Sequence, residues 1–137
     1  MVSASNDSSN PLAEIKAAYL LHRLTYGERA PSGYDILKLA TRGSARLLGR
    51  NDIGVLAPGK AADLFALDMR LPELAGADLD PANLPGTVGY SRPAKFVMVN
   101  GAVVARDGRL PRIDEPGIYE KSSASMRALL ARAGVMS

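Results

Sequence analysis

The sequence has no cysteine, no tryptophan and a single histidine, His22, among its 137 residues. The absence of cysteine excludes disulfide bonds, thiolate nucleophiles and zinc–thiolate sites. His22 has no second histidine and no carboxylate three or four residues further along the chain, so no helical metal-binding pair can form around it. These residues assemble no complete active site. We therefore expect no catalytic residue, no metal site and no bound cofactor within this chain.

Long apolar runs are also missing. No stretch approaches the roughly 18 apolar residues of a membrane-spanning helix, and the opening "MVSASNDSSN" lacks the basic and apolar parts of a secretory signal. The net charge is only +3, and the stripe of Arg42, Arg46 and Arg50 has no aromatic residue within it. Such a stripe is typical of a solvated helix face rather than of a nucleic-acid surface. We expect a cytoplasmic protein that binds neither nucleic acid nor a membrane.

What is present is the composition of one ordinary globular domain, with 47% hydrophobic and 23% charged residues. Its first predicted helix spans residues 11–26. Asn10 is a favourable N-cap, and Pro11 suits the first helical position because its missing N–H has no partner there. Gly27 suits the left-handed conformation that often follows the end of a helix.

A second helix is predicted to begin at Ser32. Ser32 and Asp35 have the spacing of a capping box. We expect Gly43 to break this helix, because glycine is a poor helix former. A short third helix, capped by Ser44, would then continue to Gly49.

Beyond residue 50 the pattern changes to strands. Residues 64–67 are apolar and bounded by Asp63 and Asp68, which predicts a buried strand. The two aspartates are five positions apart, so they would lie on opposite faces and form no acid–base pair. Asn100-Gly101 lies between two β-prone runs and predicts a hairpin with a type I′ turn.

The remaining segments are a loop and a helix. Residues 70–93 are rich in proline and glycine without a sustained period, and we expect an irregular excursion there. Residues 115–133 resemble an amphipathic helix with Met126, Leu129 and Leu130 on one side. The predicted order is therefore helices, then strands, then a helix.

Two patterns that would indicate chemistry are incomplete. Gly54, Gly59 and Lys60 have the spacing of a phosphate-binding loop, with four residues between the first glycine and the Gly-Lys pair. That motif also needs serine or threonine after the lysine, where this chain has Ala61. No Gly-x-Ser-x-Gly nucleophile elbow occurs either.

Three stretches together resemble a known family: "SASNDSSN", "IGVLAPGKAADLFALD" and "KFVMVNGAVVARDGRL". They are similar to the C-terminal third of the metal-dependent amidohydrolase superfamily. The first stretch is the most specific, and it resembles the branch that contains 8-oxoguanine deaminase and the triazine hydrolases. The resemblance covers essentially the whole chain.

The resemblance implies an α/β parent enzyme with a (β/α)₈ barrel and a small β-sandwich. Such a barrel holds zinc or iron at the carboxyl ends of its strands, and the metal activates a water that hydrolyses a C–N bond of a purine-like or triazine-like heterocycle. This chain would be a partial α+β piece of that parent. We expect barrel-closing helices in residues 1–50, sandwich strands and a long loop in 51–112, and a C-terminal helix in 113–137.

The family's metal-binding aspartate stands two residues before the "SASND" stretch, where this sequence has Met1. Its histidine ligands have no counterpart either. The resemblance places residues 3–7 in the loop after the eighth barrel strand, where Ser3, Ser5, Asn6 and Asp7 are candidate substrate-loop residues.

Three hypotheses follow. The first is a C-terminal fragment of an aminohydrolase that is inactive alone and whose parent branch is expected to form homo-oligomers. The second is a non-catalytic assembly or binding module derived from the small domain. The third is complementation by a separately encoded barrel fragment that is missing here.

Overall fold

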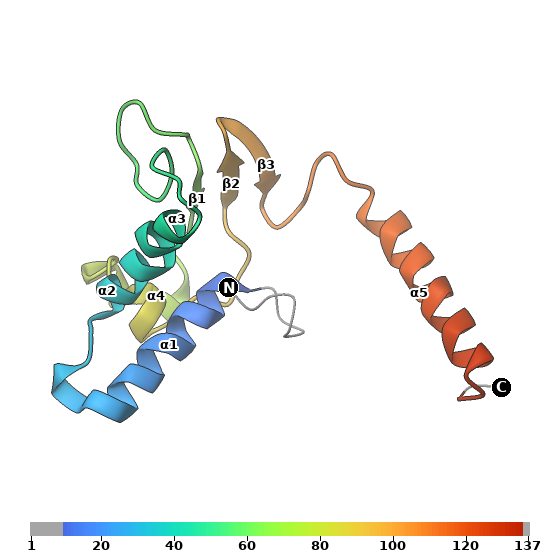
Figure 1. The fold of residues 1–137 in the computed structure, drawn as a ribbon, viewed down its shortest axis with the longest axis horizontal. Coiled ribbons are helices and arrows are strands. Elements are labelled where there is room, and N and C mark those ends of the chain that lie inside the picture. Colours follow the sequence, from blue (N-terminus) through green and yellow to red (C-terminus); the bar gives the residue numbers. More distant parts are fainter. Residues whose placement is uncertain (1–9, 136–137) are drawn as a thin grey trace.

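A computed structural model describes residues 10–135, which form an α+β arrangement (Figure 1). The chain runs through three helical segments, a first strand, a long connection, a hairpin and a final helix. In order, the helices and strands are α1 Pro11–Tyr26, α2 Gly33–Lys38, α3 Ser44–Leu47, β1 Leu64–Ala66, α4 Leu84–Thr87, β2 Phe96–Val99, β3 Ala102–Arg106 and α5 Glu115–Arg132.

Helix α1 begins and ends as its sequence predicts. The Asn10 side chain accepts hydrogen bonds from the backbone N–H groups of Leu12 and Ala13, at 3.1 and 3.3 Å, and so caps the helix. Pro11 occupies the first turn. Gly27 follows the helix with φ +57° and ψ −126°, a positive-φ conformation open to glycine but not the left-handed helical one that the sequence predicted.

The prediction that Gly43 breaks the second helix is wrong. The helix starts at the predicted capping box of Ser32 and Asp35, but it continues through a π-helical turn, Leu39–Gly43, directly into α3. Ser44 is consequently inside the helical run and not a cap. Gly43 has ordinary helical angles, φ −63° and ψ −47°. The wider turn accommodates an extra residue without ending the helix.

Packing explains why the helix continues past Gly43. Continuation places Ala45 beneath the segment that follows α3, where Ala45 is 4% exposed. Gly54 lies so close that a Cβ on it would stand 2.9 Å from the Ala45 Cβ and 3.1 Å from the Thr41 carbonyl oxygen. The glycine that resembled part of a phosphate loop is thus required for this close approach.

The strands form one antiparallel sheet in the order β1-β2-β3. Leu64 of β1 lies opposite Met98 of β2, and Phe96 of β2 lies opposite Arg106 of β3. The predicted hairpin is confirmed, and a strand forms at Leu64–Ala66 within the predicted residues 64–67. The prediction that this strand is buried is wrong, because it lies at the edge of the sheet and Phe65 is 44% exposed. Asn100 and Gly101 have φ +48° and +79°, the positive values that a type I′ turn requires.

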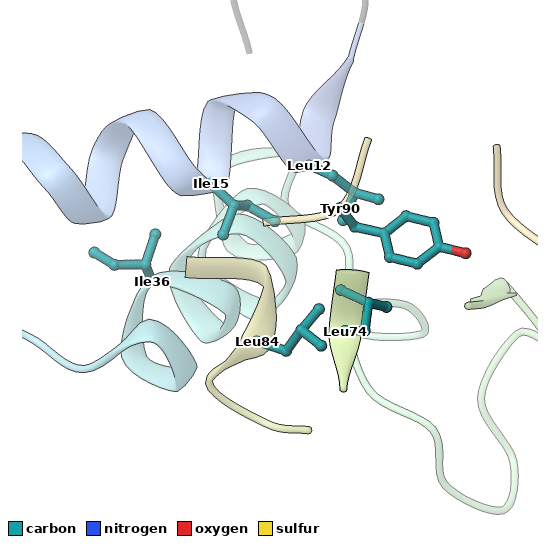
Figure 2. Packing of buried hydrophobic residues seen from close by; sticks show 6 residues of the cluster. All are labelled: Leu12, Ile15, Ile36, Leu74, Leu84 and Tyr90. Atoms are coloured by element: carbon teal, nitrogen blue, oxygen red, sulfur yellow. The ribbon is translucent and has the colours of Figure 1, made fainter. Parts of the chain in front are cut away.

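The main core joins the helices to the long connection (Figure 2). Residues 70–93 were expected to be irregular, and they do contain only short turns and α4. The connection nevertheless supplies three of the six residues in the core cluster, so its apolar positions are structural. The cluster consists of Leu12, Ile15, Ile36, Leu74, Leu84 and Tyr90.

The start of α2 touches α4 backbone to backbone. A Cβ added at Gly86 would stand 2.6 Å from the Gly33 Cα, and one added at Gly33 would stand 2.5 Å from the Asn83 carbonyl oxygen. The Asn83 side chain also accepts a 2.8 Å hydrogen bond from the Tyr34 N–H. Two glycines therefore allow the connection to lie against the helices.

Much of the apolar surface remains uncovered. The chain exposes 10226 Å², whereas a compact monomer of 14.5 kDa exposes about 6,900 Å². On α1, Leu20 is 51% exposed and Leu24 is 85% exposed, although both fit the helix's apolar period. Among residues 10–135, no helix is long and apolar enough to cross a bilayer.

Candidate functional site

The predicted substrate-loop residues Ser3, Ser5, Asn6 and Asp7 lie outside the described residues. The described residues start at Asn10, directly before α1. The region to inspect for a site is therefore the amino-terminal end of α1.

A hollow of about 360 Å³ opens at this end of α1. One wall is the first turns of α1, and the other is the connection between β1 and β2. The Lys16 Nζ bridges the two walls by donating a 2.6 Å hydrogen bond to the Val88 carbonyl oxygen. The lining residues are Asn10, Leu12, Ala13, Lys16, Leu71, Glu73, Leu74, Val88, Gly89, Tyr90, Ser91 and Arg92.

The charged groups of the hollow are paired with each other. The Arg92 Nε lies 2.5 Å from the Glu73 Oε1, and this hydrogen bond lowers the pKa of Glu73 and raises the pKa of Arg92. Both groups therefore keep their charges at neutral pH. A general acid or base needs a pKa near the working pH, so neither residue is suited to proton transfer.

Tyr90 closes the base of the hollow. Its ring belongs to the core, and its hydroxyl accepts a 3.2 Å hydrogen bond from the Asp68 N–H. The same hydroxyl donates to the Asp68 carbonyl oxygen at 3.4 Å. This hydroxyl fixes the connection after β1. The hollow thus lies between α1 and the connection, with polar groups at its rim.

His22 lies away from this hollow, on α1. Its Nδ1 is 2.7 Å from the Ala18 carbonyl oxygen, so Nδ1 carries the proton in this contact. Only Nε2 remains as a ligand atom. Among residues 10–135, no group of three histidine, cysteine or carboxylate side chains could hold a metal ion. One imidazole nitrogen does not fit a zinc site, which takes three or four protein ligands.

The other residues considered as candidates for chemistry bind backbone groups of turns. The Asp63 Oδ1 accepts a 2.6 Å hydrogen bond from the Asn100 N–H, and the Asp68 Oδ1 accepts one from the Arg70 N–H at 3.0 Å. The Lys60 Nζ donates to the Asn51 carbonyl oxygen at 2.5 Å. Asp63, Asp68 and Lys60 each bind a backbone group of this chain, so no bound ligand is needed to explain their charges.

The pairing across the hollow was not predicted from the sequence. Lys16, Glu73 and Arg92 come from three separate segments, and no spacing between them marks a common site. The proline- and glycine-rich composition of the connection predicted an irregular excursion and did not indicate its contact with α1.

The sequence of this chain is similar to the sequences of known proteins. The Amidohydrolase family model matches residues 2–104. The chain is 44% identical over 130 residues to hydroxydechloroatrazine ethylaminohydrolase of Pseudomonas sp. strain ADP, covering 93% of this chain and 27% of that protein. It is 42% identical over 129 residues to 8-oxoguanine deaminase of Pseudomonas aeruginosa, covering 94% of this chain and 28% of that protein.

A solved structure is also similar to this chain. The atrazine chlorohydrolase of Arthrobacter aurescens TC1, solved in complex with zinc, superposes with a TM-score of 0.80 at 37% identity. The match covers 89% of this chain and 27% of that one. The chain thus spans less than a third of the length of these relatives.

Proposed function

Since the chain belongs to the amidohydrolase family, we propose that it is the C-terminal portion of a metal-dependent aminohydrolase. The parent enzyme would hydrolyse a C–N bond other than a peptide bond, on a purine-like or triazine-like heterocycle. The observation that carries this proposal is the 44% identity to an ethylaminohydrolase, together with 42% to a purine deaminase.

Within the parent we assign residues 1–50 to helices that close a (β/α)₈ barrel, residues 51–112 to a small β-sandwich, and residues 113–137 to a C-terminal helix. The uncovered surface supports this assignment. Leu20 and Leu24 of α1 lie at apolar positions of the helix but are exposed. Burial of such side chains is worth about 1.5–3 kcal/mol each. A barrel that precedes this chain would cover them.

The family implies zinc or iron, but the residues described here do not fit that metal. His22 already shares one ring nitrogen with a backbone carbonyl, and no carboxylate cluster lies among residues 10–135. We therefore assign the metal ligands to the remainder of the parent and derive no catalytic step from this chain. Alone, the chain should not hydrolyse a heterocycle.

The chain's own contribution would be structural support next to the substrate. Asn10 fixes the start of α1 through two backbone N–H groups, and the resemblance to the family places Ser3, Ser5, Asn6 and Asp7 in a loop before it. We propose that these four side chains border the heterocyclic substrate in the parent enzyme. The Lys16–Val88 contact would hold the amino end of α1 against the connection.

A chimaera tests the proposal. In hydroxydechloroatrazine ethylaminohydrolase, the residues that match this chain from Ser3 onward are replaced by the residues of this chain, and the metal-binding aspartate that the family places before that stretch is kept. We expect the chimaera to bind one zinc ion and to retain measurable hydrolysis of the ethylamino substrate. A folded, zinc-loaded chimaera without turnover would contradict the proposal.

A second candidate is a non-catalytic assembly or binding module. It is favoured by the closed core of six residues and by the intact caps and turns of the described chain. A cooperative, two-state melt of the isolated monomer would support it. Recovery of activity upon co-expression with a separately encoded barrel fragment would instead support an enzyme assembled from two chains.

A further inference from the structure

The turn between β2 and β3 contains a chemically reactive pair of residues. Asn100 is followed by Gly101, and both are exposed at the end of the hairpin (Figure 1). An asparagine side chain loses its nitrogen as ammonia when the backbone nitrogen of the next residue attacks the side-chain amide carbon. Glycine in that next position has no Cβ to obstruct the attack.

Asn100 is the only asparagine of the sequence with glycine after it. The other asparagines are followed by residues with side chains, in the pairs Asn6-Asp7, Asn10-Pro11, Asn51-Asp52 and Asn83-Leu84. A Cβ added at Gly101 would have no atom within 4 Å, so no neighbouring group crowds this side of the turn. The sequence and the open surroundings both single out Asn100.

The described structure holds the attacking nitrogen in place. The Gly101 N–H donates to the Ala62 carbonyl oxygen at 3.2 Å, and the Asn100 N–H donates to the Asp63 Oδ1 at 2.6 Å. These two hydrogen bonds are the turn–β1 bonds. An amide nitrogen shares its lone pair with the carbonyl group, so it becomes a nucleophile only after base removes its proton. While the turn–β1 bonds are formed, the proton of the Gly101 N–H is not available to base.

From these features we propose that Asn100 is a site of spontaneous deamidation and that opening of the turn–β1 bonds sets its rate. In the open turn, base removes the proton from the Gly101 nitrogen, which then forms a bond to the Asn100 Cγ. The Cγ–Nδ2 bond breaks, and Nδ2 takes up a proton from water and leaves as ammonia. Water opens the resulting succinimide ring. The net change adds one water, releases one ammonia and involves no oxidation or reduction.

The two products of ring opening both disturb the turn. One product is isoaspartate, in which the main chain runs through the former side-chain carbon and is one carbon longer between Val99 and Ala102. These two residues are paired across the hairpin, and a type I′ turn fits two residues of ordinary length. The other product is an aspartate at position 100, whose carboxylate repels that of Asp63. Either product weakens the turn–β1 bonds, so the modified turn stays open.

Asn83 provides an internal reference for the packed part of the chain. Its side chain accepts a hydrogen bond from the Tyr34 N–H and donates one to the Asp80 Oδ2, both at 2.8 Å. Leu84, which follows it, is 1% exposed. Asn83 should therefore react only when the contact between α2 and α4 is lost. Comparing Asn83 with Asn100 separates opening of the turn from unfolding of the core.

Timed incubation of the 137-residue chain at mildly alkaline pH, followed by trypsin digestion and mass spectrometry, tests the proposal. Trypsin releases Asn100 within residues 96–106 and Asn83 within residues 71–95. Deamidation changes the mass of a peptide by the difference between water and ammonia. We expect Asn100 to react about tenfold or more slowly in buffer than in urea, because reaction requires local opening. Asn83 should remain unmodified in buffer.

Two variants test the role of the turn–β1 bonds. Asp63→Ala removes the charged acceptor of the Asn100 N–H and should speed deamidation in buffer about fivefold or more. Asp78→Ala, on a surface turn, is the matched control and should leave the rate unchanged. Equal rates for the two variants, or equal rates in buffer and urea, overturn the role of these bonds. An Asn100 that stays unmodified in urea overturns the site itself.

Hydrogen exchange tests the same opening without a variant. Exchange of the Gly101 amide proton is also initiated by base, so its slowing relative to the unfolded chain should match the slowing of deamidation. This measurement decides the question if Asp63→Ala also accelerates Asn83, which would mean that the variant has unfolded. Rapid deamidation of Asn100 while the Gly101 amide remains protected from exchange overturns the proposal.

Discussion

The backbone N–H of Asn100 donates a 2.6 Å hydrogen bond to the Asp63 carboxylate, across 37 residues of sequence. The Gly101 N–H donates to the Ala62 carbonyl oxygen at 3.2 Å beside it. Together these bonds fasten the hairpin turn to the residues that lead into β1. An aspartate that resembled a strand boundary is therefore a cross-link within the sheet.

Replacing Asp63 with alanine should lower the free energy of unfolding by about 1–2 kcal/mol, because the Asn100 N–H loses a charged acceptor. Urea denaturation measures the change. Asp78→Ala, on a surface turn, is the matched control and should change the free energy by less than about 0.5 kcal/mol. Equal effects of the two substitutions would argue against the cross-link.

The start of α2 should respond to acid. Lys38 is the main cause that lowers the pKa of Asp35 to about 2 from 3.8, and Ser32 adds hydrogen bonds. Because the pKa is lower in the folded chain, this stabilisation is present above pH 4 and is lost as the pH falls toward 2. Lys38→Met should raise the pKa of Asp35 in an NMR titration. An unchanged midpoint would contradict the assigned cause.

The core should be sensitive at Leu84, which is 1% exposed. Leu84→Ala should cost about 2–5 kcal/mol of the free energy of unfolding, because it removes buried atoms and leaves a cavity. Leu79→Ala, in the same connection but 87% exposed, should cost less than about 0.5 kcal/mol. Equal losses in chemical denaturation would mean that the connection does not pack as described.

The contact between α2 and α4 should exclude any side chain at Gly86. An alanine there would place its Cβ 2.6 Å from the Gly33 Cα, and overpacking of this kind costs about 1–3 kcal/mol. Gly59→Ala is a useful comparison, since Gly59, unlike Gly86, has open space around it but a φ of +78°. If thermal melts show Gly59→Ala to be the more damaging change, backbone strain outweighs the close contact.

Local signals in the sequence predicted most of the regular structure. Asn10-Pro11, the Ser32–Asp35 box and Asn100-Gly101 each specify a backbone conformation through their own side chains or φ values, so they are readable without tertiary information. Gly43 shows where this reasoning fails. Its low helix propensity costs about 1 kcal/mol, and the burial of Ala45 beneath Gly54 outweighs that cost.

The connection at residues 70–93 could not be predicted for a different reason. Leu74, Leu84 and Tyr90 are buried, but turns separate them and they follow no helical or strand period. The hollow at α1 is equally non-local, because Lys16 and Val88 meet across 72 residues. The sequence pattern along the chain does not indicate contacts between residues that are this far apart.

The central claim is that this chain carries part of an aminohydrolase without its metal site. The most direct measurement is zinc content and ammonia release by the purified 137-residue chain, with zinc added and with 8-oxoguanine, guanine, cytosine and an amino-triazine as substrates. We predict no stoichiometric zinc and no turnover. One tightly bound zinc ion per chain, with release of ammonia from any of these substrates, would contradict the claim.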